Sequence, residues 1–183
     1  MKNLSKDLGR ISKRTSDKVP WFWDNEDSQA VILVKNKMKN LPCLNLPSDT
    51  DELVLEADAS EKSWGAVLKI KGRKPEKICK YWSGTFKGSE INYPIHEKEV
   101  LAVKNGIKAF YIFLASKRFV IRTYSTYVKG FMNLNLKEAR QTRLLRLQEW
   151  FSYYRFGIEY IPSDKNVIAD SLSRELSKFI DGH

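Results

Sequence analysis

Three short apolar segments joined by short turns constrain the fold of this 183-residue chain more than any other feature. The segments cover Leu53–Leu55, Trp64–Ile70 and Lys77–Trp82. Their lengths and apolar patterns are typical of β-strands, and the turns between them are too short to contain a crossover helix. The sequence therefore predicts an antiparallel meander of three strands.

Helices and strands alternate after the meander. The predicted order is a helix, a strand, a helix, a strand and a helix, over His96–Ala115, Arg118–Tyr124, Lys137–Tyr153, Phe156–Ile161 and Val167–Leu176. A strand that follows a helical crossover tends to be parallel to its neighbour. We therefore expect an α/β fold with a five-stranded mixed sheet, three antiparallel then two parallel strands, flanked by helices.

Residues 1–50 differ from the rest of the chain. They begin with a polar, basic stretch, continue through the aromatic residues 21–23, and show helical spacing of apolar residues over 28–41. Pro42 and Pro47 end that pattern and begin an extended link. We place the main boundary near residue 50, with one domain over residues 51–183.

Composition excludes several classes of protein. The longest apolar run, residues 109–115, is too short to cross a membrane, and the first residues do not resemble a secretory signal. Two cysteines exclude a disulfide scaffold and indicate a reducing context. The net charge of +10 favours a polyanionic partner but does not choose between RNA, DNA and an acidic membrane. Solvated surface lysines explain the charge equally well.

Three acids lie beside apolar residues, where acids are unusual. Asp58 ends the first strand, Glu99 precedes Val100 near the start of a helix, and Asp170 lies inside an apolar helix pattern. Singly, they are explained as a turn residue, a partner of the helix dipole and a helix cap. If the fold brings them together, they would repel one another unless they bind a hard divalent cation such as Mg²⁺ or Mn²⁺.

These residues belong to a set of motifs that resembles a known family. The motifs resemble those of the ribonuclease H domain of retroelement reverse transcriptases, and they follow one another in the order and at the spacing of that family. They cover residues 55–60, 64–68, 81–86, 92–102 and 166–174. Residues 21–44 resemble the segment that joins the polymerase part of a gypsy-type reverse transcriptase to its ribonuclease H. The resemblance is to the plant pararetroviruses, the caulimovirus, badnavirus and tungro bacilliform virus group, with the last as the expected source.

The resemblance implies a reaction and a set of roles. Domains of this family hydrolyse the RNA strand of RNA/DNA hybrids with two Mg²⁺ ions roughly 4 Å apart, which Mn²⁺ can replace. By motif match, Asp58 would bridge both ions, Glu99 would hold the ion on the leaving-group side, and Asp170 would hold the ion that carries the attacking water. We choose Glu99 over Glu97 because Glu99 directly precedes the apolar residues of the helix.

The chain departs from the family at the fourth metal-binding carboxylate. Tyr124 occupies the position of the expected Asp. A neutral phenol with a pKa near 10 is a poor magnesium ligand, so we expect weakened metal binding on the leaving-group side and depressed cleavage. The change is deliberate, accidental or a natural variant; the sequence does not distinguish these. Tyr160 replaces a family histidine and is expected to be tolerated, and His96 and His183 are expected to lie outside the active site.

RNA/DNA hybrids are recognised by shape, phosphates and 2′-hydroxyls. The candidate contacts, each of which is also explained as surface charge or core packing, are Ser60, Lys62, Lys87, Tyr93, Arg122 and Tyr160. We find no separate basic helix between the two main helices of the kind that cellular ribonucleases H use to bind the hybrid. The fragment is therefore expected to depend on its polymerase part for binding the RNA/DNA hybrid.

The expected partners are therefore an RNA/DNA hybrid and the polymerase part of the same viral polyprotein, with no membrane. The isolated fragment is expected to be a monomer, located in the host-cell cytoplasm and the virion. The alternative is a catalytically inactive module with the same fold that binds nucleic acid or other parts of the polymerase. A structural, capsid-like protein has only the positive charge in its favour.

Overall fold

The computed structural model describes residues 11, 14, 20–39, 44–72, 76–133 and 142–180. The chain divides into two compact units, one of residues 1–43 with 178–183 and the other of residues 44–177. No helix within the described ranges is long and apolar enough to cross a membrane.

The first unit contains helix α2, Asn25–Lys39, which begins three residues before the predicted helical pattern. Two aspartates form a reciprocal cap at its start. The backbone N–H of Asp27 donates to Asp24 Oδ1 at 2.8 Å, and that of Asp24 donates to Asp27 Oδ2 at 3.0 Å. These bonds satisfy N–H groups that a helix start would otherwise leave unpaired.

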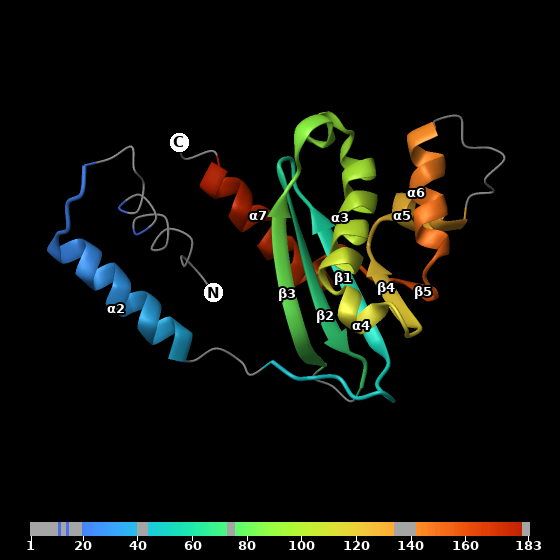
Figure 1. Cartoon of the computed structure of the whole chain (residues 1–183), viewed down its shortest axis with the longest axis horizontal. Helices are drawn as coiled ribbons and strands as arrows, with labels where there is room; N and C mark the ends of the chain where they lie inside the picture. Colours follow the sequence, from blue (N-terminus) through green and yellow to red (C-terminus); the bar gives the residue numbers. More distant parts are fainter. Residues whose placement is uncertain are drawn as a thin grey trace. The chain divides into compact units, whose positions relative to one another are not determined.

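The second unit is built on a five-stranded sheet (Figure 1). The strands are β1 Leu53–Ala59, β2 Ser63–Ile70, β3 Lys77–Thr85, β4 Phe119–Thr123 and β5 Phe156–Tyr160. Their order is β3-β2-β1-β4-β5. β1 pairs antiparallel with β2 and parallel with β4, while β2–β3 is antiparallel and β4–β5 is parallel. The predicted mixed sheet is confirmed.

Helices connect and cover these strands. They are α3 Ile95–Ala109, α4 Tyr111–Leu114, α5 Thr126–Asn133, α6 Thr142–Ser152 and α7 Val167–Ile180, with 3₁₀ turns η1 Gly88–Asn92 and η3 Ser163–Lys165. The prediction of one helix over 96–115 was wrong, because the buried Phe110 leaves the helical conformation (φ −109°, ψ 20°) and separates α3 from α4. Residues 137–141 of the next predicted helix lie outside the described residues, and α5 was not predicted.

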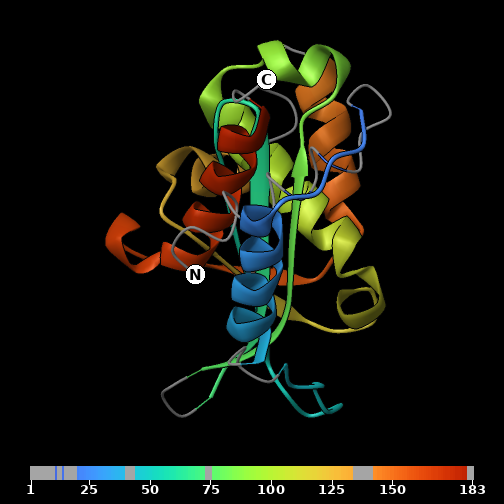
Figure 2. The ribbon, with the colours of Figure 1, turned by 90° about the vertical axis from the view of Figure 1, so that its left-hand side faces the viewer.

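Two glycines show that α3 and α7 cover opposite faces of the sheet. A Cβ atom on Gly65 would lie 2.8 Å or less from three atoms of α7, whereas a Cβ atom on Gly106 of α3 would lie 3.1 Å from the Cβ of Ala66. Gly65 and Ala66 are neighbours on β2, and successive residues of a strand point to opposite faces. Figure 2 shows the two helices on either side of the strands.

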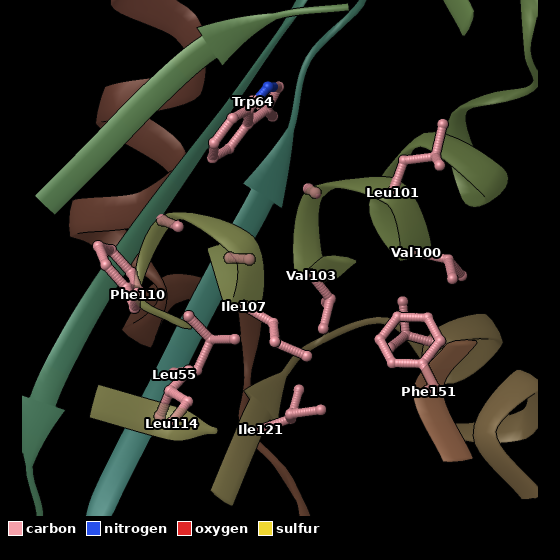
Figure 3. Packing of buried hydrophobic residues seen from close by; sticks show 14 of the residues in the cluster. Leu55, Trp64, Val100, Leu101, Val103, Ile107, Phe110, Leu114, Ile121 and Phe151 are labelled. Carbon is pink, nitrogen blue, oxygen red and sulfur yellow. The ribbon is translucent and has the colours of Figure 1, made fainter. Parts of the chain in front are cut away.

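The main hydrophobic core lies on the α3 face. Leu55 and Ile121 of the central strands pack there with Val103 and Ile107 of α3 and with Phe151 of α6 (Figure 3). The α7 face is different, because β1 places the acidic residues Glu56 and Asp58 on it. One face of the sheet therefore supplies the core, and the other supplies the polar groups considered below.

Substitution of Gly65 by alanine tests how closely α7 is seated on the sheet. The added methyl carbon would lie 2.7 Å from the backbone oxygen of Ala169 and 2.8 Å from the backbone nitrogen of Ser173. Backbone atoms cannot rotate away, so we expect Gly65→Ala to lower the free energy of unfolding by about 1–3 kcal/mol in urea titrations. Gly157→Ala is the matched control, since no atom lies within 4 Å of its added carbon. Equal stability of the two variants would contradict this seating.

Candidate active site

The three predicted acids and Tyr124 come from four separate elements. Asp58 lies near the end of β1, Glu99 in the second turn of α3, Tyr124 directly after β4, and Asp170 in the first turn of α7. Because β1 and β4 are parallel, their carboxyl ends lie at the same edge of the sheet. The N-terminal turns of α3 and α7 supply the other two acids.

Tyr124 contacts both Asp58 and Glu99. The Tyr124 hydroxyl donates to Asp58 Oδ1 at 2.7 Å and, more weakly, to Glu99 Oε1 at 3.2 Å. The Ser125 hydroxyl donates to Glu99 Oε2 at 2.6 Å, and the Ser173 hydroxyl donates to Asp58 Oδ2 at 2.5 Å. Each of the four carboxylate oxygens of this pair therefore lies within hydrogen-bond distance of a hydroxyl group, and Asp58 and Glu99 share the single Tyr124 proton; we call this arrangement the hydroxyl cage.

Burial shapes the electrostatics of the hydroxyl cage. Asp58 is only 4% exposed, and this burial raises the pKa of its carboxyl group. The hydrogen bonds from Ser173 and Tyr124 act in the opposite direction, because they stabilise the charged form. Burial and the neighbouring Asp58 carboxylate raise the pKa of Tyr124, so this phenol stays protonated and acts as a donor.

Asp170 lies beside the hydroxyl cage but has a different partner. Its Oδ1 accepts from Arg174 Nε at 2.6 Å, one turn along α7, and its side chain is 39% exposed. The charge of Asp170 contributes to the raised pKa of Asp58. The link between them is Ser173, whose hydroxyl lies 2.5 Å from Asp58 Oδ2 and 2.9 Å from the backbone oxygen of Asp170.

Serines of the β1–β2 turn hold α7 in place at this edge. The hydroxyls of Ser60 and Ser63 donate to the backbone oxygen of Ser173 at 2.9 and 2.7 Å. Ser60 was predicted to contact nucleic acid, and its hydroxyl instead anchors the helix that carries Asp170. The neighbouring Lys62 is half-buried in the same turn. Nucleic-acid contact by either residue stays a prediction.

Arg122, another predicted contact, is held by three glutamates on the α7 face. Its guanidinium lies 2.9 Å from Glu56 Oε1, 2.9 and 3.0 Å from both oxygens of Glu76, and 3.2 Å from Glu159. Burial opposes the charged form of Arg122, but Glu76 and Glu56 outweigh burial and raise its pKa. Only 11% of the side chain is exposed. These contacts favour a structural role for Arg122 rather than a phosphate contact.

Two other predicted contacts lie in one cleft. Lys87 and Tyr93 line a cleft of about 620 Å³ between η1, β2 and α3, together with Trp64 and Asn105. Lys87 is exposed, and the ring of Tyr93 packs under the Arg143 guanidinium, 4.4 Å from its centroid. The exposed Tyr160 ends β5.

Glu97 and Glu99 have different partners, and the choice of Glu99 as the metal ligand stays a prediction. Glu97 is buried and forms an ion pair with Arg143 of α6 at 2.7 Å, whereas Glu99 enters the hydroxyl cage. His96 packs its ring against Tyr127 at 4.4 Å. His183 lies outside the described residues.

The predicted two-ion site does not fit this arrangement. Carboxylate oxygens are suitable ligands for Mg²⁺, but every oxygen of Asp58 and Glu99 lies within hydrogen-bond distance of a hydroxyl group, and the Tyr124 phenol contacts both acids. Asp170 is paired with Arg174. Within the part of the chain that the structure describes, no group of three or more His, Cys, Asp and Glu residues lies close enough to hold a metal ion.

Sequence reasoning missed the two serines of the hydroxyl cage. Ser173 lies three residues after Asp170, so helical spacing places both on one side of α7. Ser125 follows Tyr124, and its hydroxyl also accepts the Val128 N–H at 3.2 Å, which caps α5. Serine before a helical pattern is a recognised cap signal, and it would have located both α5 and this hydroxyl.

The chain matches a known protein family and known viral proteins. A family model described as "RNase H-like domain found in reverse transcriptase" matches residues 23–121. The chain is 44% identical over 163 residues to the enzymatic polyprotein of carnation etched ring virus, covering 88% of this chain and 25% of the relative. It is 40% identical over 181 residues to the enzymatic polyprotein of cauliflower mosaic virus (strain NY8153), a match that covers 96% of this chain and 27% of the relative. The chain thus spans about a quarter of the length of these curated relatives.

Solved structures share the fold. A foamy viral protease-reverse transcriptase in complex with an RNA/DNA hybrid has a TM-score of 0.60 at 14% identity, covering 88% of this chain and 22% of the other. LC11-RNase H1 in complex with an RNA/DNA hybrid has a TM-score of 0.51 at 16% identity, and the match covers 68% of this chain and 95% of the other.

The viral relatives confirm the predicted group of plant pararetroviruses, while the narrower prediction of a tungro bacilliform virus stays a prediction. The family model covers more than half of the sequence. The chain belongs to the RNase H-like domains found in reverse transcriptases.

Proposed function

We propose that this chain is the ribonuclease H domain of a viral reverse transcriptase polyprotein, which binds RNA/DNA hybrids and cleaves their RNA strand only weakly. The carrying observation is the meeting of Asp58 and Glu99 at one edge of the sheet, beside Asp170. Family membership supports the reaction class, and two proteins that share the fold are in complex with RNA/DNA hybrids.

The weak cleavage follows from Tyr124. Members of this class rely on divalent ions bound by carboxylates to stabilise charge on the scissile phosphate. In this chain a phenol hydroxyl stands between Asp58 and Glu99 and supplies no negative ligand. Other parts of the domain do not depend on the residue at position 124. The hydroxyls of Ser60 and Ser63 anchor α7 through the backbone oxygen of Ser173. An accessible cleft is lined by Lys87 and Tyr93.

The wider assignments belong to the same proposal. Residues 1–50 are the connection segment from the end of the polymerase part, and residues 51–183 are the ribonuclease H domain. The polymerase part of the polyprotein is the second partner and supplies further contacts to the RNA/DNA hybrid. The isolated fragment is a monomer, and the polyprotein acts in the host-cell cytoplasm and the virion.

A non-catalytic binding module is the second candidate, and the hydroxyl cage is the observation in its favour. Such a module would keep the fold and the hybrid-binding surface without hydrolysis. The two functions differ in what happens when an acid is restored at position 124.

Restoring the acid is the decisive test of cleavage. We expect Tyr124→Asp to cut the RNA strand of a labelled hybrid at least about 100-fold faster than the unchanged chain, because a missing metal ligand costs several kcal/mol of transition-state stabilisation. The assay is run in Mg²⁺ and in Mn²⁺, with single-stranded RNA and duplex DNA as control substrates.

Two controls sharpen this assay. Tyr124→Asp combined with Asp58→Asn should lose the restored cleavage. If Tyr124→Asp and the unchanged chain both bind the hybrid and neither cuts it, the non-catalytic module is favoured. If they cut equally fast, position 124 is not a metal-ligand position.

Binding of the hybrid can be tested independently of cleavage. We expect Lys87→Gln to weaken binding and to reduce the slope of log K against log salt by about one, as the loss of one phosphate contact predicts. Lys108→Gln is the matched control, because Lys108 is exposed near the far end of α3 and its loss changes the net charge equally. Equal salt slopes for the two variants would remove Lys87 from the hybrid-binding surface.

A further inference from the structure

Among the described residues, Asp58 and Glu99 form no ion pair, whereas the nearby acids Glu56, Glu97 and Asp170 each do. The charge of Arg174, which pairs with Asp170, lowers the pKa of Asp58 less than the hydroxyls of Ser173 and Tyr124 do. Both acids nevertheless lie within hydrogen-bond distance of one phenol oxygen. Two carboxylates this close require a positive group or strong donors between them. The donors are the hydroxyls of the cage.

The hydroxyl cage reduces the binding free energy that a divalent ion would gain at Asp58 and Glu99. A magnesium ion binds oxygen at about 2.0–2.1 Å and would need the oxygens that Tyr124 now contacts at 2.7 and 3.2 Å. An ion at this point would have to displace the phenol. The partial burial of Tyr124 and its attachment directly after the buried Thr123 of β4 oppose that displacement.

We propose that the Tyr124 hydroxyl replaces a divalent cation between Asp58 and Glu99, so that this domain holds its carboxylates in place without metal. The proposal rests on the assignment of these acids to the ribonuclease H class. The proposal predicts changes in thermal stability and in ion binding, and both are measured without nucleic acid. Their outcome is therefore independent of whether the domain cleaves the hybrid.

Thermal unfolding gives the first test. We expect the melting temperature of the unchanged chain to be the same in EDTA and in Mg²⁺ or Mn²⁺. Tyr124→Phe keeps the ring and removes the donor, so it should melt roughly 4–8 °C lower in all three conditions. Tyr124→Asp should melt lower in EDTA, because three carboxylates then repel one another, and should recover when Mn²⁺ is added. Tyr153→Phe is the matched control, since Tyr153 is 76% exposed.

Ion uptake gives the second test and identifies the residues involved. Electron paramagnetic resonance counts Mn²⁺ bound per chain. We expect Tyr124→Asp to bind more Mn²⁺ than the unchanged chain, and the excess to disappear in Tyr124→Asp with Glu99→Gln. Any Mn²⁺ bound by the unchanged chain should be insensitive to Glu99→Gln.

Several results would overturn the proposal. They are stabilisation of the unchanged chain by Mn²⁺ that is lost in Glu99→Gln, an unchanged melting temperature for Tyr124→Phe, and the absence of extra Mn²⁺ in a folded Tyr124→Asp. Circular dichroism of each variant establishes that it is folded before these comparisons are made.

Discussion

The complete burial of β1 is the constraint on which the rest of the second unit depends. All seven residues of this central strand are buried, with β2 on one side and β4 on the other. Alternation of its side chains gives the α3 face the apolar residues that fill the core, and gives the α7 face two acids, Glu56 and Asp58. Acids buried in a sheet must be compensated, so this one strand dictates what its neighbours carry.

The two acids of β1 are compensated in different ways, although they lie two residues apart on the same face. Glu56 is neutralised by cations, with Lys69 at 2.5 Å and Arg122 at 2.9 Å. Within the described part of the chain, Asp58 accepts hydrogen bonds from two hydroxyls and forms no ion pair, and the charge of Arg174 acts on it less strongly than these hydroxyls do. An ion pair neutralises a charge, whereas hydroxyl donors orient a carboxylate without neutralising it. The type of partner therefore distinguishes Glu56, which lies in an ion-pair network, from Asp58, which lies in the candidate site.

Pattern and turn length predicted the sheet well, because short turns and alternating burial are local properties. The break at Phe110 and helix α5 were missed, since one depends on how a side chain is buried and the other on a serine cap within a polar stretch. At the site, the motifs predicted that Asp58, Glu99, Asp170 and position 124 would come together; Tyr124 contacts the first two directly, and Asp170 lies beside them through Ser173. The ion pairs of Arg122 could not be predicted, because its three glutamate partners are distant in sequence and their convergence is a property of the folded sheet.

The anchoring of α7 has a consequence for the order in which the domain assembles. Ser173 lies 115 residues after Asp58 in the chain, and Tyr124 lies 66 residues after it. Contacts over such separations close large loops and form late in folding. During synthesis the ribosome releases the sheet and α3 before α7, so the last hydroxyl reaches Asp58 only after almost the whole domain has emerged. The carboxylate pair is thus a product of completed folding and not a nucleus for it.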